Sequence, residues 1–451
     1  MSPDSIFRAR LHDLTARELT TFADRHPRSA ALYRNADHLF GRVPMTWMNK
    51  TPAGFPIHLD KARGNRITDV DGNEFVDFCL GDTGAMAGHS PEPVVAAVTE
   101  RLRDGLATMM PTEDAAVAGA ELARRFGLPA WSFALTATDA NRWAIRLLRA
   151  VTGRSKILVN SYCYHGSVDE SLIVVGPDGR GVSREGNVGA PVDVTMTSRV
   201  AEFNDLAGLE RELAYGDVAA VLMEPALTNI GIVLPEEGYL AGVRELTRRH
   251  GTYLINDETH TFSAGPGGAT AYWGLDPDVV TIGKAIGGGV PVGAYGLSAE
   301  LAGALSGRGD LDLVDMGGVG GTLAGNPVSM AATRATLTEV LTEEAFAGMI
   351  TTATVFADGL IEIIEGHGLP WSVSRLGARV EYRFAAPAPR NGTESARSAD
   401  AALEDFLHVY LANRGVLLTP FHNMALMCPA TTLADVARHH EIFDAALKEL
   451  M

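Results

Sequence analysis

Four short apolar segments alternate with amphipathic stretches, and this alternation constrains the fold most strongly. The apolar segments are KILVN at 156–160, AAVLM at 219–223, YLIN at 253–256 and DVVTIG at 278–283. Continuous apolar runs of this length are typical of strands that are covered on both faces. Residues 139–151 and 238–251 instead place their apolar side chains on one side, as surface helices do. The pattern predicts an α/β fold with a mainly parallel sheet wrapped by helices.

The two ends of the chain differ from its middle. The 451 residues are enough for two or three domains. Strand signals are sparse before about residue 75 and after about residue 328, where helical patterns dominate. We expect 1–75 and 326–451 to form one smaller domain around a larger domain at 76–325, with an exposed loop at 386–398.

Charge and cysteine content exclude several classes of partner. The formal net charge is −17 without any basic run, which argues against nucleic acid or anionic lipid as a partner. Three widely spaced cysteines indicate neither a disulfide framework nor a zinc site. No apolar run is expected to reach the roughly 18 residues of a membrane span. We therefore expect a cytoplasmic protein that binds small molecules or itself.

Lys284 directly follows the last apolar segment and precedes Gly287, Gly288 and Gly289. The chain has only five lysines and takes most of its positive charge from arginine, so solubility does not explain this one. Partial desolvation at a strand end favours the neutral amine, which can attack a carbonyl group to form a Schiff base. The alternative is a lysine that extends its charge to solvent beside a flexible turn.

Asp257 ends the preceding apolar segment in YLINDETHTF, at 253–262. Ligands of open α/β sheets bind just beyond the carboxyl ends of the strands. A buried aspartate there needs a cationic or hydrogen-bonding partner, which a protonated pyridine nitrogen would provide. Helix capping and metal binding are the alternatives, although no histidine has the spacing of a metal ligand.

Residues 133–150 read FALTATDANRWAIRLLRA, a strand that turns directly into an amphipathic helix. The backbone N–H groups of Ala137 and Thr138 would point outward from the first turn, where helices bind phosphate. The helix dipole contributes only about 0.3 to 1 kcal/mol in exposed settings, so further donors are required. A capping role would explain Thr136 or Thr138 equally well.

A nucleophilic lysine, a carboxylate and a phosphate cradle are the three anchors that pyridoxal 5′-phosphate (PLP) requires. The chain resembles the class III aminotransferases of PLP fold type I, and especially the branch that contains glutamate-1-semialdehyde aminomutase. The resemblance extends from about Pro56 to the carboxyl terminus. It rests on DVDGNEFVDF, AGHSPEPV, TATDAN, YHG, EPALTNIG, NDETHT, TIGKAIGGGVPVGAYG and GGTLAGNP, in family order. It implies a mainly parallel seven-stranded sheet in the large domain and a smaller α+β domain.

The resemblance also implies roles for individual residues. Lys284 would bind the cofactor as a Schiff base and shuttle a proton, Asp257 would hold the ring nitrogen protonated, and Tyr164 would stack on the ring. Thr322 would reach the phosphate from a partner subunit, so the working unit would be a homodimer with shared sites. The remaining residues expected at the cofactor are Thr136, Ala137, Thr138, His165, Glu224, Asn229 and Thr259.

The chain departs from the family pattern at several positions. The usual S-G-T-E-A reads TATDA at 136–140, and Thr259 replaces the valine that packs under the ring. For His260, we prefer a hydrogen bond within its own loop to a contact with the site.

Two further departures concern the substrate pocket. Where the aminomutase branch has an arginine that binds a substrate carboxylate, this chain has Trp47, and Asp82 stands where relatives have a pocket aromatic. An aspartate would repel a carboxylate and favour a cation, hydroxyl or amide. Alternatively, Trp47 is core packing, Asp82 is a turn residue, and another arginine such as Arg42 binds the carboxylate.

The resemblance favours an aminotransferase that moves an amino group from an amine or amino acid donor to a keto acceptor through pyridoxamine phosphate. An intramolecular aminomutase of the glutamate-1-semialdehyde type, or a racemase, on the same site is the alternative. A third hypothesis is a catalytically idle scaffold, against which the intact Lys284 and Asp257 argue.

Overall fold

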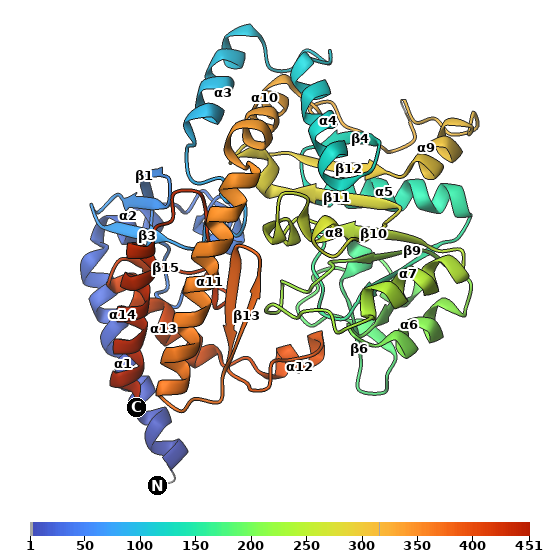
Figure 1. Ribbon diagram of the computed structural model, residues 1–451. Coiled ribbons are helices and arrows are strands. Elements are labelled where there is room, and N and C mark those ends of the chain that lie inside the picture. The colour runs from blue at the N-terminus through green and yellow to red at the C-terminus, as the bar shows by residue number, and fades with distance from the viewer. Residues whose placement is uncertain (1–2, 315) are drawn as a thin grey trace. The chain divides into compact units, whose positions relative to one another are not determined.

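The computed structural model describes residues 3–314 and 316–451, which form two compact units (Figure 1). The first unit contains Met1–Ser90, Gly348–Ala388 and Ser398–Met451, and the second contains Pro91–Ala347 and Pro389–Arg397. The main boundaries between the two compact units lie after Ser90 and Ala347. The domain boundaries predicted from the sequence lie after residues 75 and 325.

The second unit is built on a seven-stranded sheet, as the sequence predicts. Its strand order is β4-β12-β11-β10-β9-β5-β8, and all neighbours are parallel except that β12 runs antiparallel to β11 and β4. The strands are β4 Ala130–Ala134, β5 Lys156–Asn160, β8 Ser198–Ala201, β9 Val218–Met223, β10 Tyr253–Asp257, β11 Val279–Gly283 and β12 Gly293–Leu297. Every residue of β9 and of β11 is buried, which explains why their sequences are continuous apolar runs.

Helices of the second unit flank this sheet or pack on one another beside it (Figure 1). They are α3 Glu92–Asp104, α4 Glu113–Phe126, α5 Ala137–Thr152, α6 Leu206–Leu213, α7 Tyr239–Arg249, α8 Gly268–Tyr272, α9 Ala299–Ser306 and α10 Pro327–Ala335. The α5 helix begins at the N-cap Thr136 and ends before Gly153, whose left-handed backbone closes the last turn. Its face with Ala140, Ala144 and Leu148 is fully buried and packs on the sheet. The helix therefore has a fixed N-terminus at the edge of the sheet.

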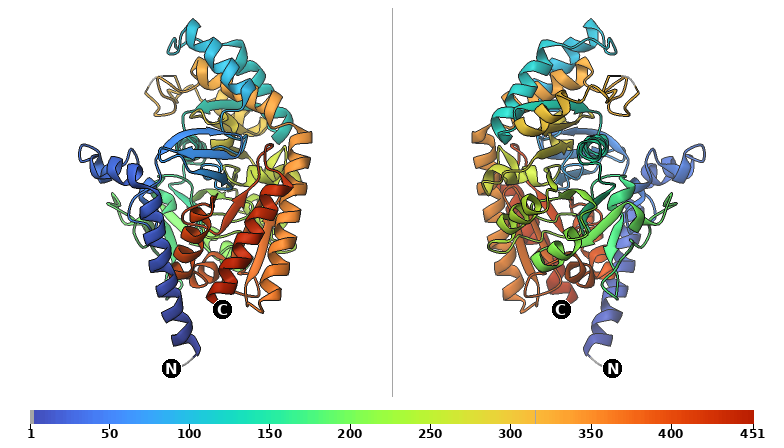
Figure 2. Two further views of the ribbon diagram at one scale, coloured as in Figure 1. Left: turned by 90° about the vertical axis from the view of Figure 1, so that its left-hand side faces the viewer. Right: turned by 90° about the vertical axis from the view of Figure 1, so that its right-hand side faces the viewer.

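The first unit combines two small sheets with helices from both chain ends. One sheet has the order β1-β2-β3-β15 and the other β13-β14-β16. The strands are β1 Leu59–Arg63, β2 Arg66–Asp69, β3 Glu74–Asp77, β13 Ser372–Leu376, β14 Arg379–Arg383, β15 Val416–Leu417 and β16 Met424–Leu426. The N-terminal helix α1 (Pro3–Arg25) packs on α13 (Ala401–Asn413) and α14 (Leu433–Leu450), beside which it lies in Figure 2.

One helix, α11 (Glu343–Gly366), is long and apolar enough to cross a membrane by length and composition. The expectation that no segment would reach this length is therefore wrong. Met349, Ala353, Phe356, Leu360 and Ile364 are nevertheless buried at helical spacing. Core helices of soluble proteins pass the same test, so the finding is weak evidence for a membrane span.

The segment 386–398, predicted to be an exposed loop of the smaller domain, is partly helical. Residues Gly392–Arg397 form α12, and residues 389–397 belong to the second unit. Gly392 and Ser395 are buried, and the Ser395 hydroxyl donates a hydrogen bond to the Ile230 carbonyl. These tertiary contacts stabilise the helix, although the Pro, Gly and Ser content of the segment predicts a loop.

Candidate active site

The carboxyl ends of six strands lie at one edge of the large sheet, and residues of the candidate site follow five of them. Because β12 is antiparallel to both of its neighbours, β4 has the same direction as β11, β10, β9 and β5. The predicted site residues follow these strand ends, with Thr136 after β4, Lys284 after β11, Asp257 ending β10, Glu224 after β9 and Tyr164 after β5. The topology thus gathers residues that are distant in the sequence.

Lys284 begins the short turn η6 (Lys284–Gly287) directly after β11. Its φ of 49° lies in the left-handed region, which side-chain-bearing residues rarely adopt and which costs on the order of 1 to 3 kcal/mol. Its Nζ lies 2.9 Å from Nε2 of His260. The preferred interpretation that His260 bonds only within its own loop is therefore wrong, because the strand ends place it against Lys284.

Asp257 is buried and holds three hydrogen bonds. Its Oδ2 accepts from Nδ2 of Asn141 at 2.8 Å and contacts Nδ1 of His165 at 2.8 Å. Its Oδ1 accepts from the Thr259 backbone N–H at 3.0 Å. These partners fix the orientation of the carboxylate at the strand end.

The contact between Asp257 and His165 shifts the pKa values of both side chains. Burial raises the pKa of Asp257, but the hydrogen bond and charge of His165 outweigh it, so the pKa lies below its ordinary value. Burial likewise disfavours the His165 imidazolium, yet Cys163 and Asp257 hold the pKa of His165 well above its ordinary value. The site therefore contains an ionised aspartate at neutral pH.

Asn141 and Thr281 support this aspartate, and neither was predicted from the sequence to belong to the site. The Thr281 hydroxyl donates to Oδ1 of Asn141 at 2.6 Å, and the Asn141 amide donates to Asp257. Asn141 lies on the buried face of α5 beside Ala140 and Ala144. An asparagine among apolar positions of an amphipathic helix is a signal that could have revealed it, because a buried amide needs a partner.

The first turn of α5 has two available backbone donors. The Thr136 side chain accepts from the Asp139 N–H at 3.1 Å, so Thr136 does act as a cap, while the Thr138 hydroxyl accepts from the Ser167 N–H at 3.3 Å. Within the described part of the chain, the N–H groups of Ala137 and Thr138 have no acceptor. They are free to bind an anion at the positive end of the helix.

Glycines allow three segments to approach this turn. A Cβ on Gly283, which precedes Lys284, would lie 2.9 Å from Cβ of Ala137. A Cβ on Gly293 would lie 2.3 Å from the Thr136 carbonyl oxygen, and one on Gly166 would lie 1.9 Å from Oγ1 of Thr138. The residue before Lys284, the start of β12 and the residue after His165 therefore all lie against the N-terminus of α5, which forms one cradle.

Gly166→Ala should damage this cradle, and Gly153→Ala is its matched control. Both glycines have positive φ, 78° and 69°, but only Gly166 has a neighbour within reach of an added Cβ. We expect Gly166→Ala to weaken cofactor affinity by about tenfold or more, because a hydrogen bond to a charged group contributes roughly 1.5 to 3 kcal/mol. Gly153→Ala should lower stability and leave the affinity unchanged. Titration of the two purified variants with PLP measures this, and equal affinities would contradict it.

The other predicted cofactor residues lie close to the same strand ends. Glu224 is buried and accepts a hydrogen bond from the Thr228 hydroxyl. In the amide orientation that satisfies its neighbours, the side-chain oxygen of Asn229 accepts from the Arg184 guanidinium at 3.1 Å. Tyr164 is half-buried. Thr259 is buried, and its hydroxyl has no hydrogen-bond partner among the described residues.

The three remaining predicted residues do not follow these strand ends in the chain. Trp47 and Asp82 belong to the first unit, where Trp47 is 39% exposed in the turn η2 (Thr46–Asn49) and packs edge-on against Phe421. Asp82 lies in a turn after β3 with a φ of 50°. Thr322 is exposed and lines a separate cavity of about 260 Å³ with residues 107–111 and 324–327.

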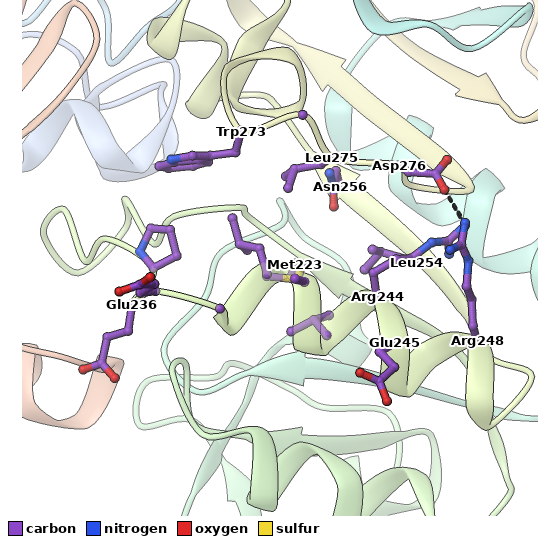
Figure 3. A pocket seen from close by; sticks show the side chains of 17 residues that line it. Met223, Glu236, Arg244, Glu245, Arg248, Leu254, Asn256, Trp273, Leu275 and Asp276 are labelled. Atoms are coloured by element: carbon purple, nitrogen blue, oxygen red, sulfur yellow. Dashed lines mark hydrogen bonds and ion pairs between the residues drawn. The ribbon is translucent and has the colours of Figure 1, made fainter.

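A larger cavity, of about 590 Å³, lies on the other side of the strand ends (Figure 3). Its lining includes Met223, Leu254, Asn256, Trp273 and Arg244. Met223 and Asn256 directly precede Glu224 and Asp257, and side chains alternate between the two faces of a strand. None of the predicted site residues lines this cavity, so it is distinct from the cluster around Lys284.

A sequence profile described as "Aminotransferase class-III" matches residues 48–447. The chain belongs to the class III aminotransferase family. A glutamate-1-semialdehyde 2,1-aminomutase from Chloroflexus aggregans is 34% identical over 407 residues, which cover 88% of this chain and 92% of that protein. The predicted family and branch are thus confirmed.

Solved structures of class III relatives share the fold. The crystal structure of a glutamate-1-semialdehyde-aminomutase from Pseudomonas aeruginosa PAO1 has 48% identity and a TM-score of 0.96, and covers 98% of this chain and 99% of its own. A lysine-to-alanine variant of that enzyme was crystallised in complex with PMP. The crystal structure of an omega-transaminase from Sphaerobacter thermophilus has 30% identity and a TM-score of 0.84, and the match covers 94% of this chain and 97% of that chain.

PLP is the cofactor of this family, and the residues of this chain fit it. A primary amine, a buried ionised carboxylate and two unbonded N–H groups at a helix N-terminus can hold an aldehyde, a pyridinium and a phosphate. The Thr259 hydroxyl, buried without a partner among the described residues, is a further polar atom that a ligand can satisfy.

Proposed function

We propose that this protein is a PLP-dependent aminomutase of the glutamate-1-semialdehyde type. The observation that carries the proposal is the full-length similarity to the aminomutase from Pseudomonas aeruginosa PAO1, with 48% identity over 98% of the chain. The curated relatives from Chloroflexus aggregans and Brevibacillus brevis bear the same activity in their names, each at 34% identity. The similarity favours this function over the intermolecular transamination that the sequence motifs favoured.

The proposed reaction rearranges a single substrate. Glutamate 1-semialdehyde has an aldehyde at C1 and an amine at C2, and a 2,1-aminomutase moves the nitrogen to C1 and leaves a ketone at C2. The product is the isomer 5-amino-4-oxopentanoate, so no second substrate is consumed. An aminotransferase would instead convert its donor into a carbonyl compound in stoichiometric amounts.

The residues of the cluster would divide this work. Bound PLP supplies an electron sink that stabilises negative charge on the substrate carbon. Lys284 would hold the cofactor aldehyde and then accept and return the substrate proton as a general base and acid. Asp257, ionised and oriented by Asn141 and His165, would keep the ring nitrogen protonated. The Ala137 and Thr138 amides would hold the phosphate.

The test is incubation of the purified enzyme with glutamate 1-semialdehyde alone. Conversion to 5-amino-4-oxopentanoate in many turnovers, without an added amino donor or keto acid, is expected. A requirement for a second amino donor or acceptor, with one keto product per turnover, would instead establish transamination.

The second candidate function, transamination of a substrate without a carboxylate at the aminomutase position, is favoured by Trp47 and Asp82. The chain lacks the arginine expected at Trp47, and an aspartate repels a carboxylate. Comparing kcat/KM for a neutral amine, a diamine and α-amino acids tests it. A preference for the diamine that Asp82→Asn reduces would support this candidate, and a strong preference for glutamate 1-semialdehyde would refute it.

We further propose that the enzyme works as a homodimer in which Thr322 completes the partner's phosphate cradle. Thr322 is exposed and lines a cavity whose lining contains neither Ala137 nor Thr138, and Met109 and Met110 in the same lining are 80% and 70% exposed. Exposed apolar side chains of this kind are typical of interfaces between subunits.

Thr322→Ala should then weaken PLP binding by about 10- to 150-fold, which corresponds to one hydrogen bond to a charged group. Equilibrium titration of the variant checks this, with Thr108→Ala, in the same cavity, as the control. A fully active monomer at low concentration would contradict the shared site.

A further inference from the structure

His260 contacts the lysine of the site through the register of two strands. Parallel strands β10 and β11 place Asp257 opposite Thr281. His260 and Lys284 lie three residues further along the chain, in the turns that follow the two strands, and Nε2 of His260 lies 2.9 Å from Nζ of Lys284. The register of the two strands brings both turns to the same edge of the sheet, where the two side chains meet.

The chemistry of the two nitrogens fixes the direction of the hydrogen bond. A lysine ammonium has three N–H donors and no acceptor, so Nε2 of a neutral His260 must accept. A neutral amine can also donate one N–H to Nε2, and its lone pair then points away from the imidazole. The same contact thus orients the lysine in both of its protonation states.

The two carboxylates next to His260 in the sequence accept hydrogen bonds from other groups. Asp257 accepts from His165, Asn141 and the Thr259 N–H. Glu258 accepts from the Thr261 hydroxyl at 2.6 Å and from the N–H groups of Ala269 and Thr270 at 3.0 and 2.6 Å. Both acidic side chains of this turn are thus committed to other groups, while His260 faces the lysine.

We propose that His260 is a positioning residue that holds the ε-amino group of Lys284 by accepting its hydrogen bond and so directs the lone pair of the free amine at the substrate. The proposal rests on the role of Lys284 given under the proposed function. It assigns to the imidazole a task that a valine, methionine or leucine at this position could not perform, because none of these side chains has a comparable acceptor.

The first experiment measures the lysine without any substrate. In apoprotein, an amine-reactive acylating reagent is applied near pH 8, and labelling of Lys284 is compared with that of Lys156 by mass spectrometry. Loss of the acceptor in His260→Leu destabilises the ammonium, so labelling of Lys284 should rise by about tenfold. His260→Gln, whose amide oxygen can accept, should restore the wild-type rate, and Lys156 should be unaffected. Equal labelling of Lys284 in wild type and His260→Leu would overturn the proposal.

The second experiment uses the holoenzyme and any amino substrate that it accepts. Washout of the substrate α-deuterium should slow by about 10- to 100-fold in His260→Leu with little change in KM, and His260→Gln should recover most of the rate. A loss that appears only in KM, or no recovery with glutamine, would overturn the proposal. Failure of the enzyme to use glutamate 1-semialdehyde would refute the proposed function and leave both readouts intact.

Discussion

Lys284→Ala should abolish turnover. The ε-amino group of Lys284 is expected to transfer the substrate proton, and general acid–base catalysis of this kind contributes about 10²- to 10⁴-fold. The variant also loses the covalent bond to the cofactor, so the measured loss should be at least this large. Its left-handed backbone, with a φ of 49°, should tolerate alanine no worse than lysine, so the variant should fold.

Turnover and the visible absorbance of the bound cofactor check this prediction. Lys156→Ala is the matched control, because Lys156 begins β5 and its Nζ donates to the Thr195 carbonyl away from the cluster. The control should keep its yellow colour and its rate. A Lys284→Ala enzyme that turns over within tenfold of the wild type would contradict the assignment of this lysine.

Asp257→Asn should be the second most damaging change, with a loss of about 10²- to 10³-fold. Removing one partner of a buried charge pair costs roughly 3 to 5 kcal/mol, and the amide cannot hold a pyridine nitrogen protonated. The amide group also places its NH2 against a donor in either orientation, namely the Thr259 N–H or the Asn141 and His165 groups, so one hydrogen bond is lost. PLP should still bind through the lysine and the phosphate cradle.

Steady-state rates and the pH dependence of unfolding measure this effect. Since the pKa of Asp257 is lowered on folding, its ionisation stabilises the native state above the unfolded pKa of about 3.9. That stabilisation is lost as the pH falls through the lower, folded value. Wild type should therefore be more stable than Asp257→Asn at pH 7, and the difference should shrink in acid.

The matched control for this pair of measurements is Asp278→Asn. Asp278 is an aspartate beside β11 that pairs with Arg244 at 2.7 Å and lies outside the cluster. Its replacement should lower stability and leave the rate per folded molecule unchanged. A rate loss in Asp278→Asn as large as in Asp257→Asn would show that general destabilisation explains both.

The sequence was sufficient to predict those site residues whose position depends only on where a strand ends and in which direction it runs. Lys284 and Asp257 each stand directly at the end of an apolar run, and parallel strands bring such ends to one edge. The strands at 156–160 and 253–257 agree with the runs predicted at 156–160 and 253–256, because a strand covered on both faces has a mainly apolar sequence.

The remaining contacts depend on information that no single segment contains. The His260–Lys284 pair requires the register of β10 against β11, which is set by side-chain packing across the whole sheet. Asn141 belongs to the TATDAN motif, but the motif does not reveal its role, because its hydrogen-bond partner Asp257 is 116 residues away in the sequence. The helix at Gly392–Arg397 depends on its contact with Ile230 and not on its own propensity.

The glycines of the cradle differ in whether a second substitution could compensate for replacing them with a larger residue. A side chain at Gly166 would meet Oγ1 of Thr138, so shortening Thr138 could partly compensate for it. A side chain at Gly293 would meet the carbonyl oxygen and carbon of Thr136, which belong to the main chain and cannot be trimmed by any substitution. Directed-evolution libraries for new substrates should therefore keep Gly293 fixed and vary position 166 only together with position 138.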